Sequence, residues 1–260
     1  MQCIIFSPTN TTRTIVRHIA STLADEPATI IDLTLPEKKE PLSGKGPVII
    51  GMPVYGGRIP ALAAQRLRAL GTGQGLPAIV VVVYGNRAFD DALLELRDLA
   101  LELGFIPVAG AAFVGEHSFS TATHPIGAGR PDQQDLSKAQ EMGRAVHQKL
   151  DHYPDLSTWP KLEVPGNFPY REGVAPAPIA PETLTENCVL CGECALVCPT
   201  QCITITQSSV ETDKNNCLRC CACVRVCAYE ARVLLEPKMV EFAHNLHKKF
   251  QRRAEPEVFL

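Results

Sequence analysis

The sequence predicts an α/β domain with a doubly wound, five-stranded parallel sheet, followed by a small cysteine-rich α+β domain. Three observations lead to this prediction. Strand-like and helix-like segments alternate through the first 150 residues, prolines recur from Pro154 to Pro181, and ten of the eleven cysteines lie between Cys188 and Cys227. Alternating strands and helices are typical of parallel sheets with helices on both faces. The prolines separate the two regions, because proline lacks a backbone donor and favours an extended chain.

The order of its segments defines the first domain. Short apolar runs predict strands, and apolar residues spaced three or four apart predict helices. The run 78–84 is rich in valine and apolar throughout, so it should be buried on both faces of the sheet. The expected strands are 3–6, 29–33, 48–52, 78–84 and 108–114, and the expected helices are 12–24, one that begins at Pro60, 90–103 and 135–150. A ligand of such a sheet binds beyond the carboxyl ends of the strands.

Four regions follow from these patterns. They are the α/β domain over 1–152, a proline-rich linker that runs extended over the surface at 153–181, the cysteine-rich domain over 182–236, and a helix with a tail over 237–260. Helical spacing over 237–253 places Met239, Ala243, Leu246 and Phe250 on one face. We expect this helix to pack against the first domain. An interaction helix for an acidic carrier protein is the alternative.

Composition and charge exclude several classes of protein. The chain of 260 residues carries 25 Lys and Arg against 28 Asp and Glu, which gives a formal charge of −3. A nucleic-acid-binding protein that works through a basic field needs clustered Lys and Arg, so this class is disfavoured. No apolar run approaches the roughly 18 residues that span a bilayer, and the N-terminus lacks a signal-peptide pattern. We expect a cytoplasmic protein with no membrane span and no nucleic-acid partner.

The cysteines form two copies of one cluster-binding pattern, C-x2-C-x2-C-x3-C, with a proline after the first copy. Thiolates at every third residue can reach neighbouring corners of one cubane, whereas the fourth cysteine points at the other cluster. The expected ligands are Cys188, Cys191, Cys194 and Cys227 for one [4Fe–4S] cluster, and Cys217, Cys220, Cys223 and Cys198 for the second. Structural zinc is the alternative, since four-cysteine zinc sites also contain C-x2-C pairs. Two identical runs with the x3 spacing favour the clusters, and a disulfide framework is disfavoured without a secretory signal.

This pattern resembles the bacterial-type ferredoxins with two [4Fe–4S] clusters, over about residues 182–236. The sequence departs from them at Ala228, which replaces the proline expected after the last cysteine. Cys202 and Cys221 are not needed as ligands. We interpret each as a small buried hydrophobic residue; an exchanged ligand or a redox-labile thiol, and with it a redox sensor, is the alternative.

Three loops at the carboxyl edge of the predicted sheet suit a phosphate joined to a planar ring. The loop 7–12 is rich in hydroxyl groups and precedes a helix, so it can hold an anion, although ordinary helix caps use the same residues. The loops after the third and fourth strands combine aromatic residues with glycine, which lets the backbone approach a flat ring. Neither a Walker A pattern nor G-x-G-x-x-G is present. The combination indicates FMN.

The region 1–150 therefore resembles flavodoxin. The phosphate loop of that family, Ser/Thr-x-Thr-Gly-x-Thr, is matched by Ser7, Thr9 and Thr12, with Asn10 in the place of glycine. Asn tolerates positive φ better than most residues. The resemblance implies that the FMN phosphate is held by Ser7, Thr9, Asn10, Thr11 and Thr12, and the ring by Pro53, Val54, Tyr55 and Gly56 on one side and by Gly85, Asn86, Arg87 and Phe89 on the other. The whole chain resembles flavodoxin–ferredoxin fusion proteins.

The loop 116–132 is long for a connection in an α/β domain, which favours a functional role. We hypothesise that it folds over the flavin or docks against the cluster domain, with His117 as a proton donor. An exposed loop with solvated histidines is the alternative.

Two clusters and FMN in one chain predict internal electron transfer, in which the protein supplies position and polarity. We expect an iron–sulfur flavoprotein that moves single electrons between two [4Fe–4S] clusters and FMN in anaerobic metabolism, with a ferredoxin, a flavodoxin or an oxidoreductase as its redox partner. The alternative is an FMN-dependent reductase of a small acceptor, such as a quinone or a nitro compound. Bound cofactors would lower the formal charge from −3 to about −9, so the partner should present a basic face.

Overall fold

The computed structural model describes residues 1–260 except 25, 38, 40, 41, 43–45, 153, 154, 157, 158 and 176. In the first domain strands and helices alternate as predicted, and their bounds differ from the expected ones by at most two residues. They are β1 (Gln2–Ile5), α1 (Thr11–Leu23), β2 (Thr29–Asp32), β3 (Val48–Pro53), α2 (Ala61–Leu70), β4 (Pro77–Tyr84), α3 (Ala92–Glu102), β5 (Ile106–Val114) and α4 (Gln133–His152).

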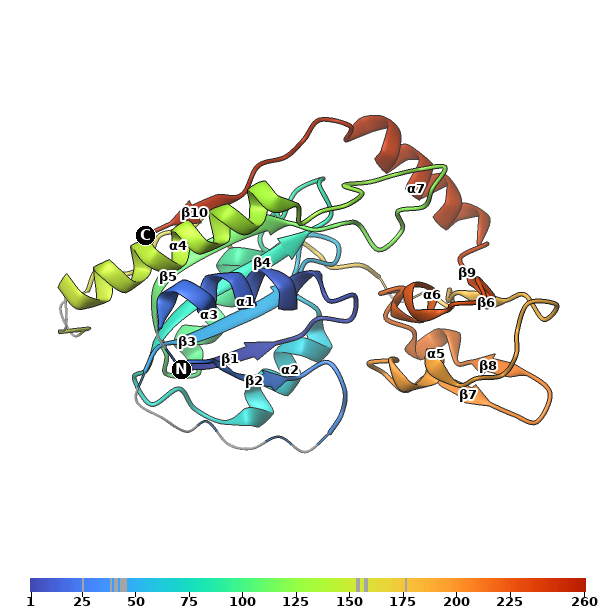
Figure 1. Ribbon diagram of the computed structural model, residues 1–260, viewed down its shortest axis with the longest axis horizontal. Helices are drawn as coiled ribbons and strands as arrows, with labels where there is room; N and C mark the ends of the chain where they lie inside the picture. Colours follow the sequence, from blue (N-terminus) through green and yellow to red (C-terminus); the bar gives the residue numbers. More distant parts are fainter. Residues whose placement is uncertain are drawn as a thin grey trace.

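The strands form one sheet in the order β2-β1-β3-β4-β5-β10 (Figure 1). The first five are parallel, since β1 pairs with β2 and β3, β3 pairs with β4, and β4 pairs with β5. The order 2-1-3-4-5 is that of the flavodoxin-like doubly wound fold, which confirms the predicted fold class. In this fold the winding reverses between β1 and β3 and leaves a crevice at their carboxyl ends.

The five parallel strands are present as predicted, and the end of the chain adds a sixth, antiparallel strand that the sequence did not predict. Helix α7 (Pro237–Lys249) ends earlier than the predicted helix. The chain then continues to β10 (Glu257–Phe259), which pairs antiparallel with β5. Without β10, β5 would be an edge strand with unpaired backbone groups. A strand of three residues is too short to show a period in the sequence, so its existence depends on the edge that it covers.

Helices cover both faces of the sheet. Helices α1 and α4 pack on one face, around Ile19 and Met142, and α2 and α3 pack on the other, around Leu67 and Leu96. Gly143 lets α4 approach α1 closely, because a Cβ atom at this position would lie 2.3 Å from the carbonyl oxygen of Ile19. No helix in the described part of the chain is long and apolar enough to cross a membrane.

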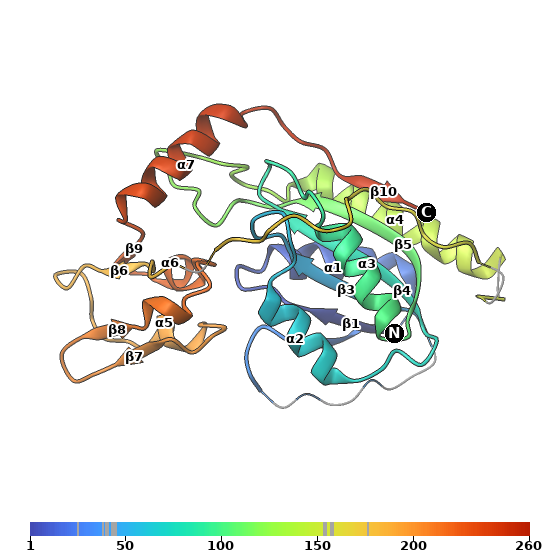
Figure 2. The same cartoon turned by 180° about the vertical axis from the view of Figure 1, so that it is seen from behind.

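The cysteine-rich domain is a small α+β unit beside the carboxyl edge of the sheet (Figures 1 and 2). Its elements are β6 (Glu182–Thr183), α5 (Glu193–Leu196), β7 (Ile203–Ile205), β8 (Val210–Thr212), the 3-10 helix η2 (Lys214–Asn216), α6 (Ala222–Val226) and β9 (Arg232–Val233). Strand β6 pairs with β9 and β7 pairs with β8, both antiparallel. From β9 the chain returns through α7 to the first domain (Figure 2).

The linker between the domains is extended but anchored. Its described residues from 159 to 181 form neither a helix nor a strand. Asp91, just before α3, accepts the backbone N–H groups of Asn167 at 2.8 Å and Arg171 at 2.7 Å. Burial alone would raise the pKa of Asp91, but these hydrogen bonds lower it. The linker is therefore fixed along the first domain instead of being a loose tether.

Candidate cofactor sites

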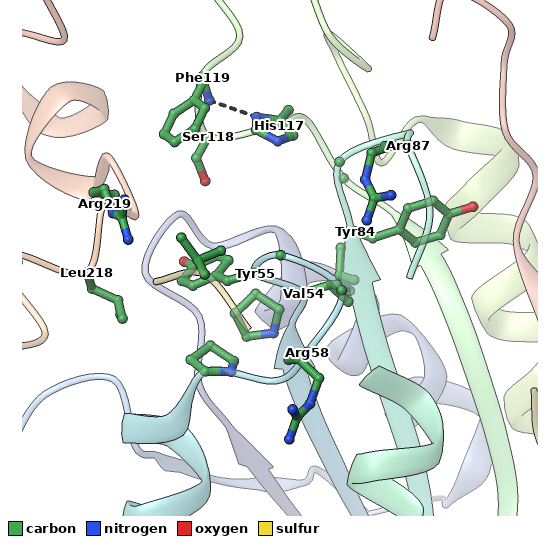
Figure 3. Close-up of a pocket in the computed structure, with 18 of the residues that line it drawn as sticks. Val54, Tyr55, Arg58, Tyr84, Arg87, His117, Ser118, Phe119, Leu218 and Arg219 are labelled. Carbon is green, nitrogen blue, oxygen red and sulfur yellow. Dashed lines mark hydrogen bonds between the residues drawn. The ribbon is translucent and has the colours of Figure 1, made fainter. Parts of the chain in front are cut away.

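A cavity of about 610 Å³ lies where the carboxyl edge of the sheet meets the cysteine-rich domain and α7 (Figure 3). Its volume is in the usual range for small-molecule sites. The first domain contributes Thr9, Thr11, residues 53–61, Val83, Tyr84, Gly85, Arg87 and Ala88 to the lining. The opposite wall consists of residues 115–119, Gly173, Val174, Cys217, Leu218, Arg219, Met239, Phe242 and Leu246. Segments far apart in the sequence thus enclose one space.

Eight of the thirteen residues that the flavodoxin resemblance implied line this cavity. They are Thr9, Thr11, Pro53, Val54, Tyr55, Gly56, Gly85 and Arg87. The other five lie elsewhere. Ser7 and Thr12 are buried, Asn10 is exposed, and the side chains of Asn86 and Phe89 have other partners.

The loop between β1 and α1 fits a phosphate group. The N–H of Arg13 donates to Ser7 Oγ at 3.0 Å, and Asn10 has a φ of 65°. Thr12 Oγ1 is buried and has no hydrogen-bond partner among the described residues. A buried hydroxyl without a partner is destabilising, and the first N–H groups of α1 have no partner within the helix. An anion held at this helix N-terminus would satisfy these groups.

Asn86 and Phe89 do not line the cavity and contact other residues. Asn86 Nδ2 donates to the carbonyl oxygens of Phe250 at 2.7 Å and Arg252 at 2.9 Å, and its Oδ1 accepts the N–H of Ala254 at 3.1 Å. Phe89 is buried against Tyr84, with 5.5 Å between the ring centroids. The resemblance assigned the whole loop to the flavin, whereas the structure divides it between the cavity and the C-terminal segment.

Tyr55, in the loop after β3, is near the cysteines. Its backbone N–H donates to the carbonyl of Arg58 at 2.9 Å, which closes a tight turn. Burial raises the pKa of the Tyr55 hydroxyl, and the neighbouring Cys220 and Cys221 raise it further. Tyr55 thus lines the cavity and is also near the second cysteine run.

The opposite wall of the cavity is mostly apolar. Phe119 and Phe242 meet with 6.2 Å between their ring centroids, and Met239 and Leu246 extend the same surface. Ile126 of the long loop 116–132 packs against Leu246, so the loop and α7 form one layer. As we expected, α7 packs against the first domain.

The loop 116–132 lies over the cavity and also contacts the cysteine-rich domain. Arg225 of α6 pairs with Glu116 at 2.9 Å and donates to the carbonyl of His117 at 3.2 Å. His117 lines the cavity (Figure 3). Burial, followed by the positive charges of Arg87 and Arg225, lowers the pKa of His117 to about 4. The ring is therefore neutral at pH 7, and a role for His117 as a proton donor stays a prediction.

The two predicted sets of cysteines lie in two separate small pockets. Cys188, Cys191, Cys194 and Cys227, here the outer set, line a pocket made only of residues 188–232. Cys198, Cys217, Cys220 and Cys223, here the inner set, line another. Each run thus sends its fourth cysteine to the other set. Cys191 is exposed and Cys220 is buried, and Cys217 lines both the inner pocket and the large cavity.

The two additional cysteines are buried in the inner pocket. Cys202 Sγ lies 3.6 Å from Cys198 Sγ, and Cys221 precedes α6 with a φ of 57°. Their burial agrees with our interpretation of small hydrophobic residues. Cys202 is also close enough to Cys198 to replace a ligand of the inner set if one were lost.

The first cysteine run matches a known protein family. Residues 181–204 match the family model of the 4Fe-4S binding domain. This match supports an iron–sulfur cluster over the zinc alternative for this region. No curated protein matches the chain in sequence.

Several solved structures resemble part of the chain. A flavodoxin from the domain Archaea has 15% identity and a TM-score of 0.40, and the alignment covers 58% of this chain and 100% of that one. The Flv1 flavodiiron core from Synechocystis sp. PCC6803 has 18% identity and a TM-score of 0.41 over 58% of this chain and 36% of that one. Fusobacterium nucleatum flavodoxin bound to flavin mononucleotide has 16% identity and a TM-score of 0.37 over 57% and 96%.

The strand order and the family match together define the class of the protein. A flavodoxin-like α/β domain is joined in one chain to a ferredoxin-type iron–sulfur domain, as the sequence predicted. What this combination does depends on its sites, because a fold alone does not fix a function.

The opposite wall of the cavity was not predicted from the sequence. Leu218 and Arg219 occupy the variable positions of a C-x2-C pair, which the motif leaves unspecified. Phe242 lies beside the helical face that we expected to be buried. All three line the cavity. The cysteine-rich domain and α7 both lie at the carboxyl edge of the sheet (Figure 1), and this arrangement, which no local pattern encodes, brings them there.

Proposed function

We propose that this protein moves single electrons between two [4Fe–4S] clusters and FMN, and that it does so in anaerobic metabolism. The position of Cys217 supports this proposal most strongly. This residue of the inner set lines the same cavity as the flavin loops, so a cluster and a flavin bound there would be neighbours. When bound, FMN supplies both one-electron and two-electron chemistry.

The residues of the chain have separate tasks in this proposal. Thr9, Thr11 and the N-terminus of α1 hold the phosphate, while Gly56 and Gly85 let the backbone approach the ring. Polar contacts then hold the domains in place. Arg66 donates to the carbonyl of Pro199 at 2.7 Å, directly after Cys198. The inner set is thereby tied to the domain that would bind the flavin.

The apolar wall favours a second candidate function, the reduction of a small acceptor. A flavin that serves only protein partners needs an exposed edge. Here Phe119, Met239, Phe242 and Leu246 cover the cavity, and an apolar planar acceptor such as a quinone or a nitroaromatic compound suits such a surface.

Anaerobic reconstitution tests the proposed function. We expect about eight iron atoms and one FMN per chain. After mixing with reduced ferredoxin, the flavin absorbance should bleach together with that of the clusters. If the clusters are reduced and the flavin never is, internal transfer is wrong. Quinones and nitroaromatic compounds added to the reduced protein then separate the two functions, since only a reductase turns them over catalytically.

A further inference from the structure

The ring of His117 has a fixed place at the wall of the cavity. It lies against Gly85, where a Cβ atom would be 2.3 Å from His117 Cδ2. Gly85 is therefore needed for this close approach. The His117 and Phe119 rings are also in contact, with 5.1 Å between their centroids. The ring thus packs against both Gly85 and Phe119, and Figure 3 shows it beside Phe119.

A backbone hydrogen bond fixes the tautomer of His117. The N–H of Phe119 donates to His117 Nδ1 at 3.0 Å. A backbone N–H can only donate, so Nδ1 carries no proton, and the single proton of the neutral ring is on Nε2. His117 therefore has one hydrogen-bond donor, and the ring that carries it lines the cavity.

The same loop is held from the cysteine-rich domain. Arg225 contacts both Glu116 and the carbonyl oxygen of His117. The position of the His117 ring thus depends on the docking of the two domains as well as on the local turn.

We propose that His117 Nε2–H is a fixed hydrogen-bond donor to an acceptor atom of the flavin ring, and that it raises the flavin reduction potential. The inference deepens the proposed function and rests on it, since it requires a flavin in this cavity. This acceptor is N1 or a carbonyl oxygen of the ring, which gains electron density when the flavin is reduced; N5 is not meant, because reduction protonates it and turns it into a donor. A fixed donor therefore stabilises the reduced form more than the oxidised form. His117 supplies a hydrogen bond in this role and no proton.

Two substitutions test the proposal. His117→Gln keeps an N–H donor near the position of Nε2, and His117→Phe keeps a planar ring without a donor. We expect His117→Phe to weaken FMN binding roughly tenfold and to make the flavin potential more negative. His117→Gln should restore most of both. The measurements are a fluorescence titration with FMN and an anaerobic redox titration, with iron content as a check on folding.

The pH dependence gives a second readout. A proton donor would add an inflection to the plot of flavin potential against pH at its own pKa, whereas the neutral donor adds none between about pH 5.5 and 8. Unchanged affinity and potential in His117→Phe, or an inflection in wild type that His117→Gln removes, would overturn the proposal. In either case bound FMN would leave the proposed function intact. Failure of the wild type to bind FMN would contradict the proposed function itself.

Discussion

At the scale of single residues, the Thr12 hydroxyl offers the most direct test of phosphate binding. This hydroxyl is buried without a partner in the described structure, so Thr12→Val removes an unsatisfied group at nearly constant volume. We expect the unliganded protein to keep or gain stability, by roughly 1 kcal/mol. FMN should bind about tenfold more weakly, whereas riboflavin, which lacks the phosphate, should bind equally to both forms. Thermal unfolding and fluorescence titration measure these changes.

A neighbouring threonine provides the matched control. Thr14 lies on the same helix, and its exposed hydroxyl donates to the carbonyl of Asn10 at 2.9 Å. Thr14→Val should leave the affinity for FMN unchanged. If Thr12→Val also binds FMN like the wild type, Thr12 is only a core residue and does not hold the phosphate.

At the scale of elements, the C-terminal segment 250–260 is a strap over the first domain. Asn86 holds it through three hydrogen bonds, and the backbone of Asn86 has a φ of 64°. Asn86→Gly keeps this backbone conformation but removes the amide. We expect the strap to be less stable by roughly 2–3 kcal/mol, so that the β10 amides exchange hydrogen faster and FMN dissociates faster.

An exposed ion pair on the same strap is the comparison. Arg253 pairs with Asp132, and both side chains are about a third exposed. Such pairs contribute about 1 kcal/mol or less, so Arg253→Ala should change hydrogen exchange less than Asn86→Gly. Equal effects of the two substitutions would show that the amide does not clamp the strap.

The strap also shows where prediction from sequence ends. The elements of the first domain were predictable because their periodicity extends over many residues, as in β4, which is buried throughout. The cysteine spacing likewise predicted two sets of four thiols, and the members of each set line one pocket. The partners of Asn86 are more than 160 residues away in the sequence, and no local pattern encodes them. The same holds for Leu218 and Phe242, which reach the cavity only through the docking of domains.

At the scale of the whole molecule, the two cysteine sets differ in their position relative to the large cavity. Cys217 of the inner set lines the large cavity, whereas the outer pocket contains residues of its own domain only, and Cys191 is exposed. Electron transfer slows steeply with distance. We therefore expect electrons from a protein donor to arrive at the outer cluster and to reach the flavin through the inner one.

Two ligand variants separate these roles. In Cys220→Ser, reduced ferredoxin should bleach the outer cluster at the wild-type rate, while flavin reduction lags at least about tenfold behind it. In Cys191→Ser, electrons arrive more slowly, but the remaining inner cluster and the flavin should change together without a lag. Anaerobic stopped-flow absorbance measures the lag, and electron paramagnetic resonance shows which cluster each variant retains. A flavin that keeps pace in Cys220→Ser and lags in Cys191→Ser would reverse the order, because the outer cluster would then be the one that serves the flavin.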